Sequence, residues 1–155
     1  GTITFNGRNV TALTAADRCR SGLVRTHQIP KPFSGMTTFE NVFVAASHGK
    51  TSNRDEAYER AVDSLQLCGM LSVANRRADT LGLLDRKRLE LARALATGPR
   101  LLLLDELGGG LTDGEASEPV GTILGLRLDR AYRSHSPAGR RTANLHGCRQ
   151  DHRRW

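Results

Sequence analysis

Residues 86–106 read RKRLELARALATGPRLLLLDE. Apolar side chains recur over 89–96 at the spacing of one helix face, and the pair Gly98-Pro99 is typical of a helix end. The four leucines Leu101–Leu104 form an apolar run that has the length of a strand, and such runs are typical of parallel strands covered on both faces. The stretch therefore predicts a helix, a turn and a buried strand in an α/β fold.

Asp105 and Glu106 follow this strand directly. Ligands bind at the carboxyl ends of strands in open α/β sheets, so the two carboxylates are candidates for phosphate chemistry. A strand that leaves the core for a solvated turn gives the same local pattern. The neighbouring sequence favours a site. A glycine-rich turn follows at 108–110, and residues 80–85 lead into the preceding helix, where backbone N–H groups and the helix dipole favour an anion.

The order of these motifs resembles a known family. Residues 81–115, LGLLDRKRLELARALATGPRLLLLDELGGGLTDGE, are similar to the signature motif, Walker B strand and D-loop of an ABC transporter ATP-binding subunit of the branched-chain amino acid importer type. Residues 25–42 resemble that family's Q-loop and the segment behind it, and residues 1–11 resemble the strand and turn after its P-loop helix. The resemblance covers residues 1–126 and implies a P-loop NTPase fold with a helical subdomain that carries the signature.

The resemblance also implies a role for each matching residue. Asp105 would hold Mg²⁺, and Glu106 would orient or deprotonate the water that attacks the γ-phosphate of ATP. Gln28 would contact the metal and this water and report nucleotide state to transmembrane permease subunits. The resemblance implies a head-to-tail dimer. ATP held by the second subunit would be contacted by Leu81, Gly82, Leu83, Leu84 and Asp85. The dimer interface would be crossed by Gly110, Leu111, Thr112 and Asp113. The implied location is cytoplasmic, on the inner face of the plasma membrane.

The sequence also departs from the family pattern. Gly82 stands where the signature LSGGQ has serine, and Leu83 and Leu84 stand at its two glycines, which weakens direct phosphate contact there. The P-loop belongs before Gly1, and the HGKT stretch at 48–51 is expected to be a loop rather than a substitute for it. No apolar strand that ends in a switch histidine follows position 126. We therefore expect a domain that is incomplete at both ends and an ATPase that is inactive alone.

The charge of the chain is concentrated in its last 29 residues. The 155 residues carry a formal net charge of +7, but residues 1–126 hold 15 Lys and Arg against 14 Asp and Glu, whereas residues 127–155 hold 8 Arg against 2 Asp. Residues 127–155 have too few apolar side chains to offset the entropy of ordering. They fit a basic arm for nucleic acid or an acidic membrane, a disordered extension, or an out-of-frame translation. The abrupt change favours the last, so no specific nucleic acid is expected.

Two alternatives to the importer function follow: a remnant that docks on a transporter without hydrolysing ATP, and a nucleic-acid-binding protein that acts through residues 127–155. The remaining features fit a domain with no targeting or membrane segment. Three widely spaced cysteines fit free thiols in a reducing cytoplasm. Arg86, Lys87 and Arg88 are expected on a surface. Helix starts are expected at three N-cap pairs: Thr14 with Asp17, Thr37 with Glu40, and Asn53 with Glu56.

Overall fold

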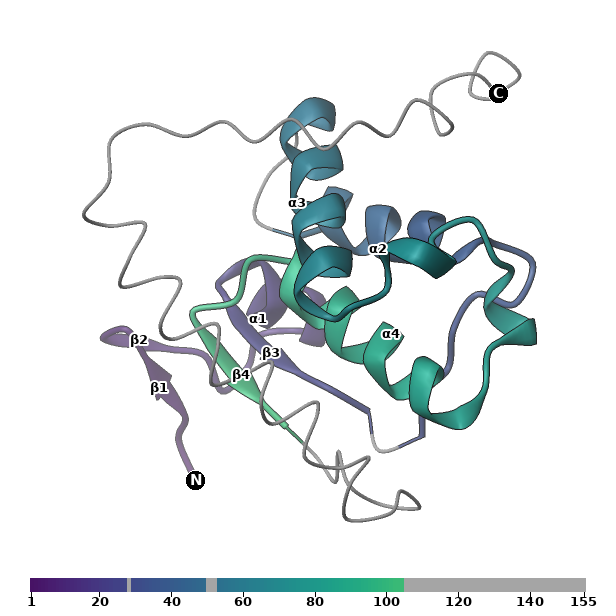
Figure 1. Cartoon of the computed structure of the whole chain (residues 1–155). Helices are drawn as coiled ribbons and strands as arrows, with labels where there is room; N and C mark the ends of the chain where they lie inside the picture. The colour runs from purple at the N-terminus through teal and green to yellow at the C-terminus, as the bar shows by residue number, and fades with distance from the viewer. Residues whose placement is uncertain (28, 50–52, 105–155) are drawn as a thin grey trace.

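The computed structural model describes residues 1–27, 29–49 and 53–104, and these form helices packed beside a parallel pair of strands (Figure 1). The predicted domain boundary at 126 lies outside the described residues. Two 3₁₀ turns, Leu71–Val73 and Ala78–Thr80, join the last two helices. The helices are α1 (Ala15–Arg20), α2 (Thr38–Ser47), α3 (Arg54–Leu67) and α4 (Leu83–Ala96), and the strands are β1 (Thr4–Phe5), β2 (Arg8–Asn9), β3 (Leu23–Arg25) and β4 (Leu101–Leu103).

The three predicted helix starts are confirmed. At α2 the hydroxyl of Thr37 accepts from the N–H of Glu40 at 3.1 Å, and the Glu40 carboxylate accepts from the N–H of Thr37 at 2.7 Å. This reciprocal pair satisfies two N–H groups that the helix itself leaves without partners. Thr14 caps α1 through the N–H of Asp17, and Asn53 caps α3 through two backbone N–H groups of its first turn.

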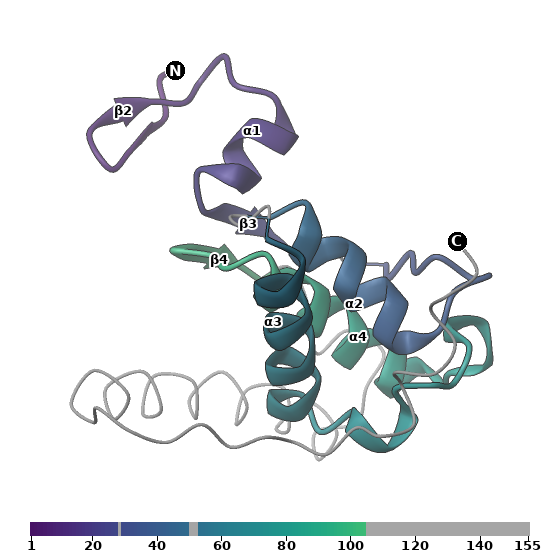
Figure 2. The same cartoon turned by 90° about the horizontal axis from the view of Figure 1, so that it is seen from above.

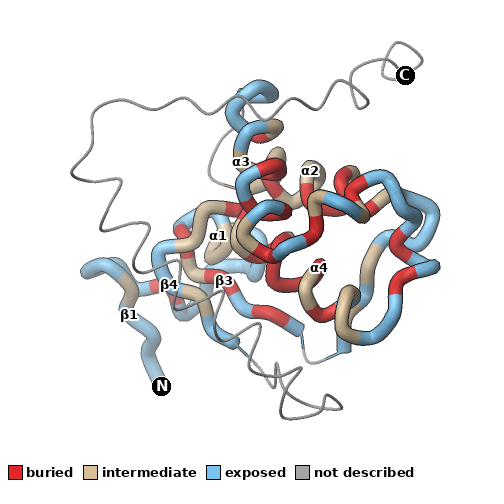
Figure 3. Tube along the Cα trace, viewed as in Figure 1, coloured by how far each residue is buried: buried red, intermediate tan, exposed pale blue. Residues whose placement is uncertain are grey.

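Helices α2, α3 and α4 share one apolar core (Figures 2 and 3). On α3 the inner face is formed by Ala57, Ala61 and Leu65, which are all buried. Phe39 of α2 is buried in this core, stacked on Phe43 at 5.9 Å between ring centroids and tilted against Tyr58 of α3 at 5.2 Å. The amphipathic pattern of each helix is thus satisfied by the other two helices.

Strands β3 and β4 pair in parallel, with Leu23 opposite Leu101 and Arg25 opposite Leu103. The strand predicted at Leu101–Leu104 is therefore confirmed, but its predicted burial on both faces is wrong. Leu101 and Leu103 are 43% and 47% exposed, and only Leu102 packs against the helical core. Successive side chains of a strand point to opposite faces, and the described helices α2–α4 cover only one face of this strand.

The first twenty residues lie on the other side of β3 and β4 from α2 and α3 (Figures 1 and 2). β1 and β2 form an antiparallel hairpin whose two-residue turn is Asn6-Gly7, with positive φ at both positions. Asn-Gly is the preferred turn for such a hairpin because both residues adopt positive φ at low cost. Helix α1 follows and leads into β3.

His48 and Gly49 of the HGKT stretch follow the end of α2, and Gly49 has a packing role there. A Cβ atom at Gly49 would lie 2.6 Å from both Cα and the carbonyl oxygen of Thr97, which caps the C-terminus of α4. The ends of α2 and α4 approach so closely that only glycine fits. This glycine is therefore explained by helix packing, while Lys50 and Thr51 lie outside the described residues.

In the described ranges, every helix is too short or too polar to cross a membrane.

Candidate functional site

The signature-like segment forms the first turn of α4. The sequence pattern begins this helix at Arg86, and that boundary is wrong: α4 begins at Leu83, with Gly82 as its N-cap. The N–H of Arg86 donates to the carbonyl of Gly82 at 2.9 Å, which closes the first helical turn. The N–H groups of Leu83, Leu84 and Asp85 precede this bond, and no side chain caps them. They carry the positive end of the helix dipole.

The same turn presents a glycine and a leucine to solvent. Leu81 is buried and anchors the segment in the core, whereas Gly82 is exposed and Leu83 is 51% exposed. A Cβ at Gly82 would meet no atom within 4 Å, and its φ of −67° suits any residue. A serine would therefore fit at Gly82 without strain. Leu83 offers no polar atom beyond its backbone, so an anion at this turn would be met by backbone N–H groups.

The charges of the first turns partly neutralise one another. The Asp85 carboxylate pairs with Arg88 at 3.1 Å, and both side chains are partly buried. A carboxylate in the first turn is favoured by the helix dipole and repels a second anion. The expected surface position is wrong for Lys87, which is 6% exposed, because α4 turns this position towards the protein. Arg86 is exposed as expected.

An ion pair fixes the loop in front of α4. Arg77 contacts the carboxylate of Asp79 at 2.7 Å, and its hydrogen bond holds the pKa of Asp79 below the usual range and raises that of Arg77. Arg86 of α4 reaches back and donates to the backbone carbonyl of Asp79 at 3.0 Å. The pair is exposed, so its effect on stability is small. The hydrogen bond from Arg86 to the Asp79 carbonyl joins this loop to the first turns of α4.

The structure brings together the two strands that precede the other predicted site residues. The N–H of Thr26, just after β3, donates to the carbonyl of Leu103 in β4 at 3.0 Å. Because the strands are parallel, the chain leaves both at the same end of the pair. Gln28 follows one strand and Asp105 follows the other. This is the edge at which α/β sheets bind ligands.

Several predicted site residues are not described by the structure. Of the predicted site residues, the structure describes only those at the start of α4, and the predicted roles stay predictions. In the described ranges, no three His, Cys, Asp or Glu side chains lie close enough together to hold a metal ion. The predicted residues outside the described ranges are Gln28, Asp105, Glu106, Gly110, Leu111, Thr112 and Asp113.

Two residues near this edge were not predicted from the sequence. Glu90 and Arg93 lie on α4, and Glu90 is 8% exposed although it is charged. Its carboxylate accepts from the N–H of His27 at 3.4 Å. A glutamate between two leucines in an amphipathic helix was the available signal, because such a residue either faces solvent or has a specific partner.

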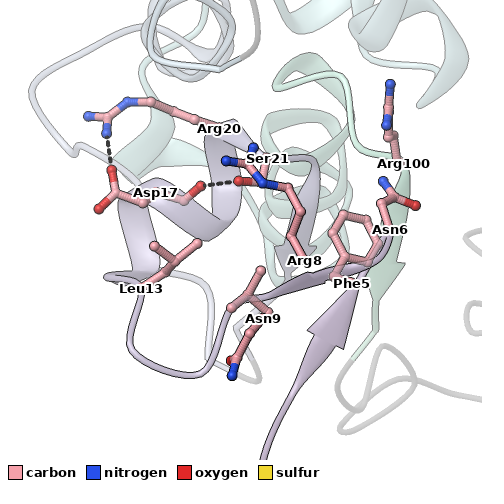
Figure 4. A pocket seen from close by; sticks show the side chains of 10 residues that line it. Phe5, Asn6, Arg8, Asn9, Leu13, Asp17, Arg20, Ser21 and Arg100 are labelled. Atoms are coloured by element: carbon pink, nitrogen blue, oxygen red, sulfur yellow. Dashed lines mark hydrogen bonds and ion pairs between the residues drawn. The ribbon is translucent and has the colours of Figure 1, made fainter.

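A hollow of about 640 Å³ lies elsewhere, between the β1–β2 hairpin, α1 and Arg100 (Figure 4). Asp17 and Arg20 pair within it at 2.7 Å, and Arg8 also lines it. Most of its lining side chains are exposed, and it shares no residue with the predicted site. The concavity is therefore separate from the edge that carries the candidate chemistry.

Comparisons with known proteins establish the family. The pattern of the ABC transporter family matches residues 1–107, so this chain belongs to the ABC transporter family. A curated relative, the high-affinity branched-chain amino acid transport ATP-binding protein LivG of Salmonella typhimurium, is 36% identical over 141 residues, which cover 82% of this chain and 55% of LivG. BraF of Pseudomonas aeruginosa, described in the same words, is 33% identical over 83% of this chain and 56% of its own length. The chain spans about half the length of these relatives.

Solved structures agree on the fold. One described as an ATP-binding cassette of an ABC transporter has a TM-score of 0.69 and 27% identity, and the match covers 81% of this chain and 54% of that chain. Another, a dimeric cassette in a post-hydrolysis state bound to ADP and Pi, has a TM-score of 0.69 at 18% identity, with 84% and 59% covered. The predicted α/β fold of the ABC ATPase type is therefore confirmed.

Proposed function

We propose that this chain is part of the ATP-binding subunit of an ABC importer for branched-chain amino acids. The single observation that carries the proposal is the 36% identity to LivG across 141 residues. The paired ends of β3 and β4, in front of Gln28 and Asp105, support it from the geometry, because nucleotide chemistry needs these two segments side by side. The proposed partners are transmembrane permease subunits and a second ATP-binding subunit, and the proposed location is the inner face of the plasma membrane.

The residues have the following proposed roles. Asp105 and Gln28 hold Mg²⁺, and Glu106 orients or deprotonates the attacking water. The segment Leu81–Asp85, which leads into α4 and forms its first turn, faces the γ-phosphate of the other subunit, and Gly110–Asp113 lies at the subunit interface. Bound ATP with Mg²⁺ supplies the phosphoanhydride bond whose hydrolysis drives transport.

The start of α4 fits an anion in part. Its uncapped N–H groups and the open space at Gly82 admit a phosphate oxygen. Asp85 opposes an anion, but its pairing with Arg88 reduces that effect. Compared with a serine, Gly82 offers no hydroxyl. We therefore infer that Gly82→Ser strengthens nucleotide contact at this turn.

A transport assay tests the proposal. Residues 1–107 of this chain would replace the matching segment of LivG, and leucine uptake would be measured in cells that lack LivG. We expect uptake that Glu106→Gln abolishes and Gly82→Ser increases. Uptake that is unaffected by Glu106→Gln, or a folded chimera that supports none even with Gly82→Ser, would contradict the proposal.

A further inference from the structure

Glu90 of α4 holds the end of β3. One carboxylate oxygen accepts from the N–H of His27 at 3.4 Å, and the other accepts from Nη1 of Arg93 at 3.2 Å. Glu90 is only 8% exposed. A carboxylate removed from water is costly unless it is paired and hydrogen-bonded, and here both oxygens have partners. The contact joins residues 63 positions apart in the sequence.

Arg93 extends this contact to the other side of position 28. Its Nη1 atom donates to the backbone carbonyl of Lys31 at 3.0 Å, and its guanidinium lies 5.1 Å from the centre of the Phe33 ring. A cation over an aromatic face is attracted by the charge distribution of the ring, and the attraction is stronger where water is excluded. The Glu90–Arg93 pair therefore forms hydrogen bonds to the backbone both before and after position 28.

Asn41 of α2 holds the backbone of Phe33, the residue whose ring contacts Arg93. Its side-chain oxygen accepts from the N–H of Phe33 at 2.8 Å, and its amide donates to the carbonyl of Phe33 at 3.1 Å. Asn41 is fully buried. The backbone of Phe33 is thus held by α2, and its ring meets Arg93 of α4, so the segment is fixed by two helices.

We propose that Glu90 and Arg93 are positioning residues that keep both flanks of position 28 at a set distance from α4. The first turn of this helix is the signature-like segment Leu83–Asp85, so the pair links two segments to which nucleotide contacts are assigned. This role rests on the proposed function, but the contacts themselves do not. An apolar pair would fill the same space at lower desolvation cost, and the charged pair adds defined bonds to the backbone.

Nuclear magnetic resonance of the full 155-residue chain tests the role of Glu90 without nucleotide. In the unsubstituted chain we expect a nuclear Overhauser effect between the His27 amide proton and the Glu90 side chain. Glu90→Gln keeps the shape and removes the charge, so the His27 amide should move upfield and exchange with solvent about tenfold faster. The matched control is Glu56→Gln, which breaks the 2.8 Å pair with Arg60 on α3, and it should leave His27 unchanged.

The role of Arg93 is tested by a pair of variants. Arg93→Leu removes the cation from the Phe33 ring, so the ring-proton resonances of Phe33 should shift, and Arg93→Lys should recover part of that shift because it keeps a cation over the ring.

Three results would overturn the proposal. The first is the lack of the Overhauser effect in the unsubstituted chain, which requires no variant to fold. The second is equal exchange at His27 in Glu90→Gln and Glu56→Gln. The third is a rise in exchange that spreads evenly over α2 and α3, because that would mean general destabilisation rather than positioning. These measurements involve neither ATP nor a permease, so they decide the positioning role even if the transport test fails.

Discussion

Replacing Asn41 by alanine should destabilise the chain more than its small change in size suggests. The side chain makes three hydrogen bonds, to the N–H and carbonyl of Phe33 and to the carbonyl of Thr37. At roughly 0.5–1.5 kcal/mol of net stability each, their sum is about 1.5–4.5 kcal/mol.

The surroundings of Asn41 place the expected loss of stability in the lower half of that range. The carbonyl of Thr37 keeps its helical bond from the N–H of Asn41, so it is not left without a donor. Phe33 is 46% exposed, so water replaces part of what its backbone loses. We therefore expect Asn41→Ala to lower the free energy of unfolding by about 2 kcal/mol, or about thirtyfold in the unfolding equilibrium constant.

The measurement is urea unfolding followed by helical circular dichroism at low protein concentration. Asn9→Ala is the matched control, because Asn9 makes one exposed hydrogen bond, from the N–H of Thr11 at 2.9 Å. It should cost less than about 0.5 kcal/mol. If the two variants differ by less than about 0.5 kcal/mol at equal denaturant slope, the argument from buried hydrogen bonds is wrong.

Four other perturbations test separate parts of the structure. Gly82→Ser should raise the free energy of unfolding by roughly 0.3 kcal/mol, and with it the melting temperature slightly, because serine caps a helix better than glycine; a lower melting temperature would contradict the open space at Gly82. Burial raises the pKa of the Cys68 thiol from 9.0 to about 12. The folded state therefore holds this proton more tightly than the unfolded state. The contribution of Cys68 to the free energy of unfolding should be fully present below pH 9 and should be lost between pH 9 and 12. Thiol reagents should modify Cys19 well before Cys68, and equal rates would refute the burial. Leu103→Thr should reduce self-association in light scattering, because Leu103 is 47% exposed on β4, whereas Leu102→Thr should lower stability instead; the reverse pattern would show that the faces of β4 are misassigned.

The sequence located one described segment of the candidate site, and the roles of its residues stay predictions. The resemblance named Leu81–Asp85, and the structure places Leu83–Asp85 in the first turn of α4, where no side chain caps the N–H groups. Glu90 and Arg93 were not predicted, because their partners lie far away in the sequence. A periodicity pattern reports which face of a helix is apolar, but it does not report which backbone group meets a charged residue on that face.

The sequence by itself determined the features that are settled within one turn or one strand. The capping box at Thr37 and Glu40 involves residues three positions apart, and the apolar run at Leu101–Leu104 was enough to predict a strand. The tertiary structure alone decided how deeply that strand is buried and where the ends of β3 and β4 meet. Burial and strand pairing depend on segments distant in the chain, and no local pattern specifies which segment covers a given face.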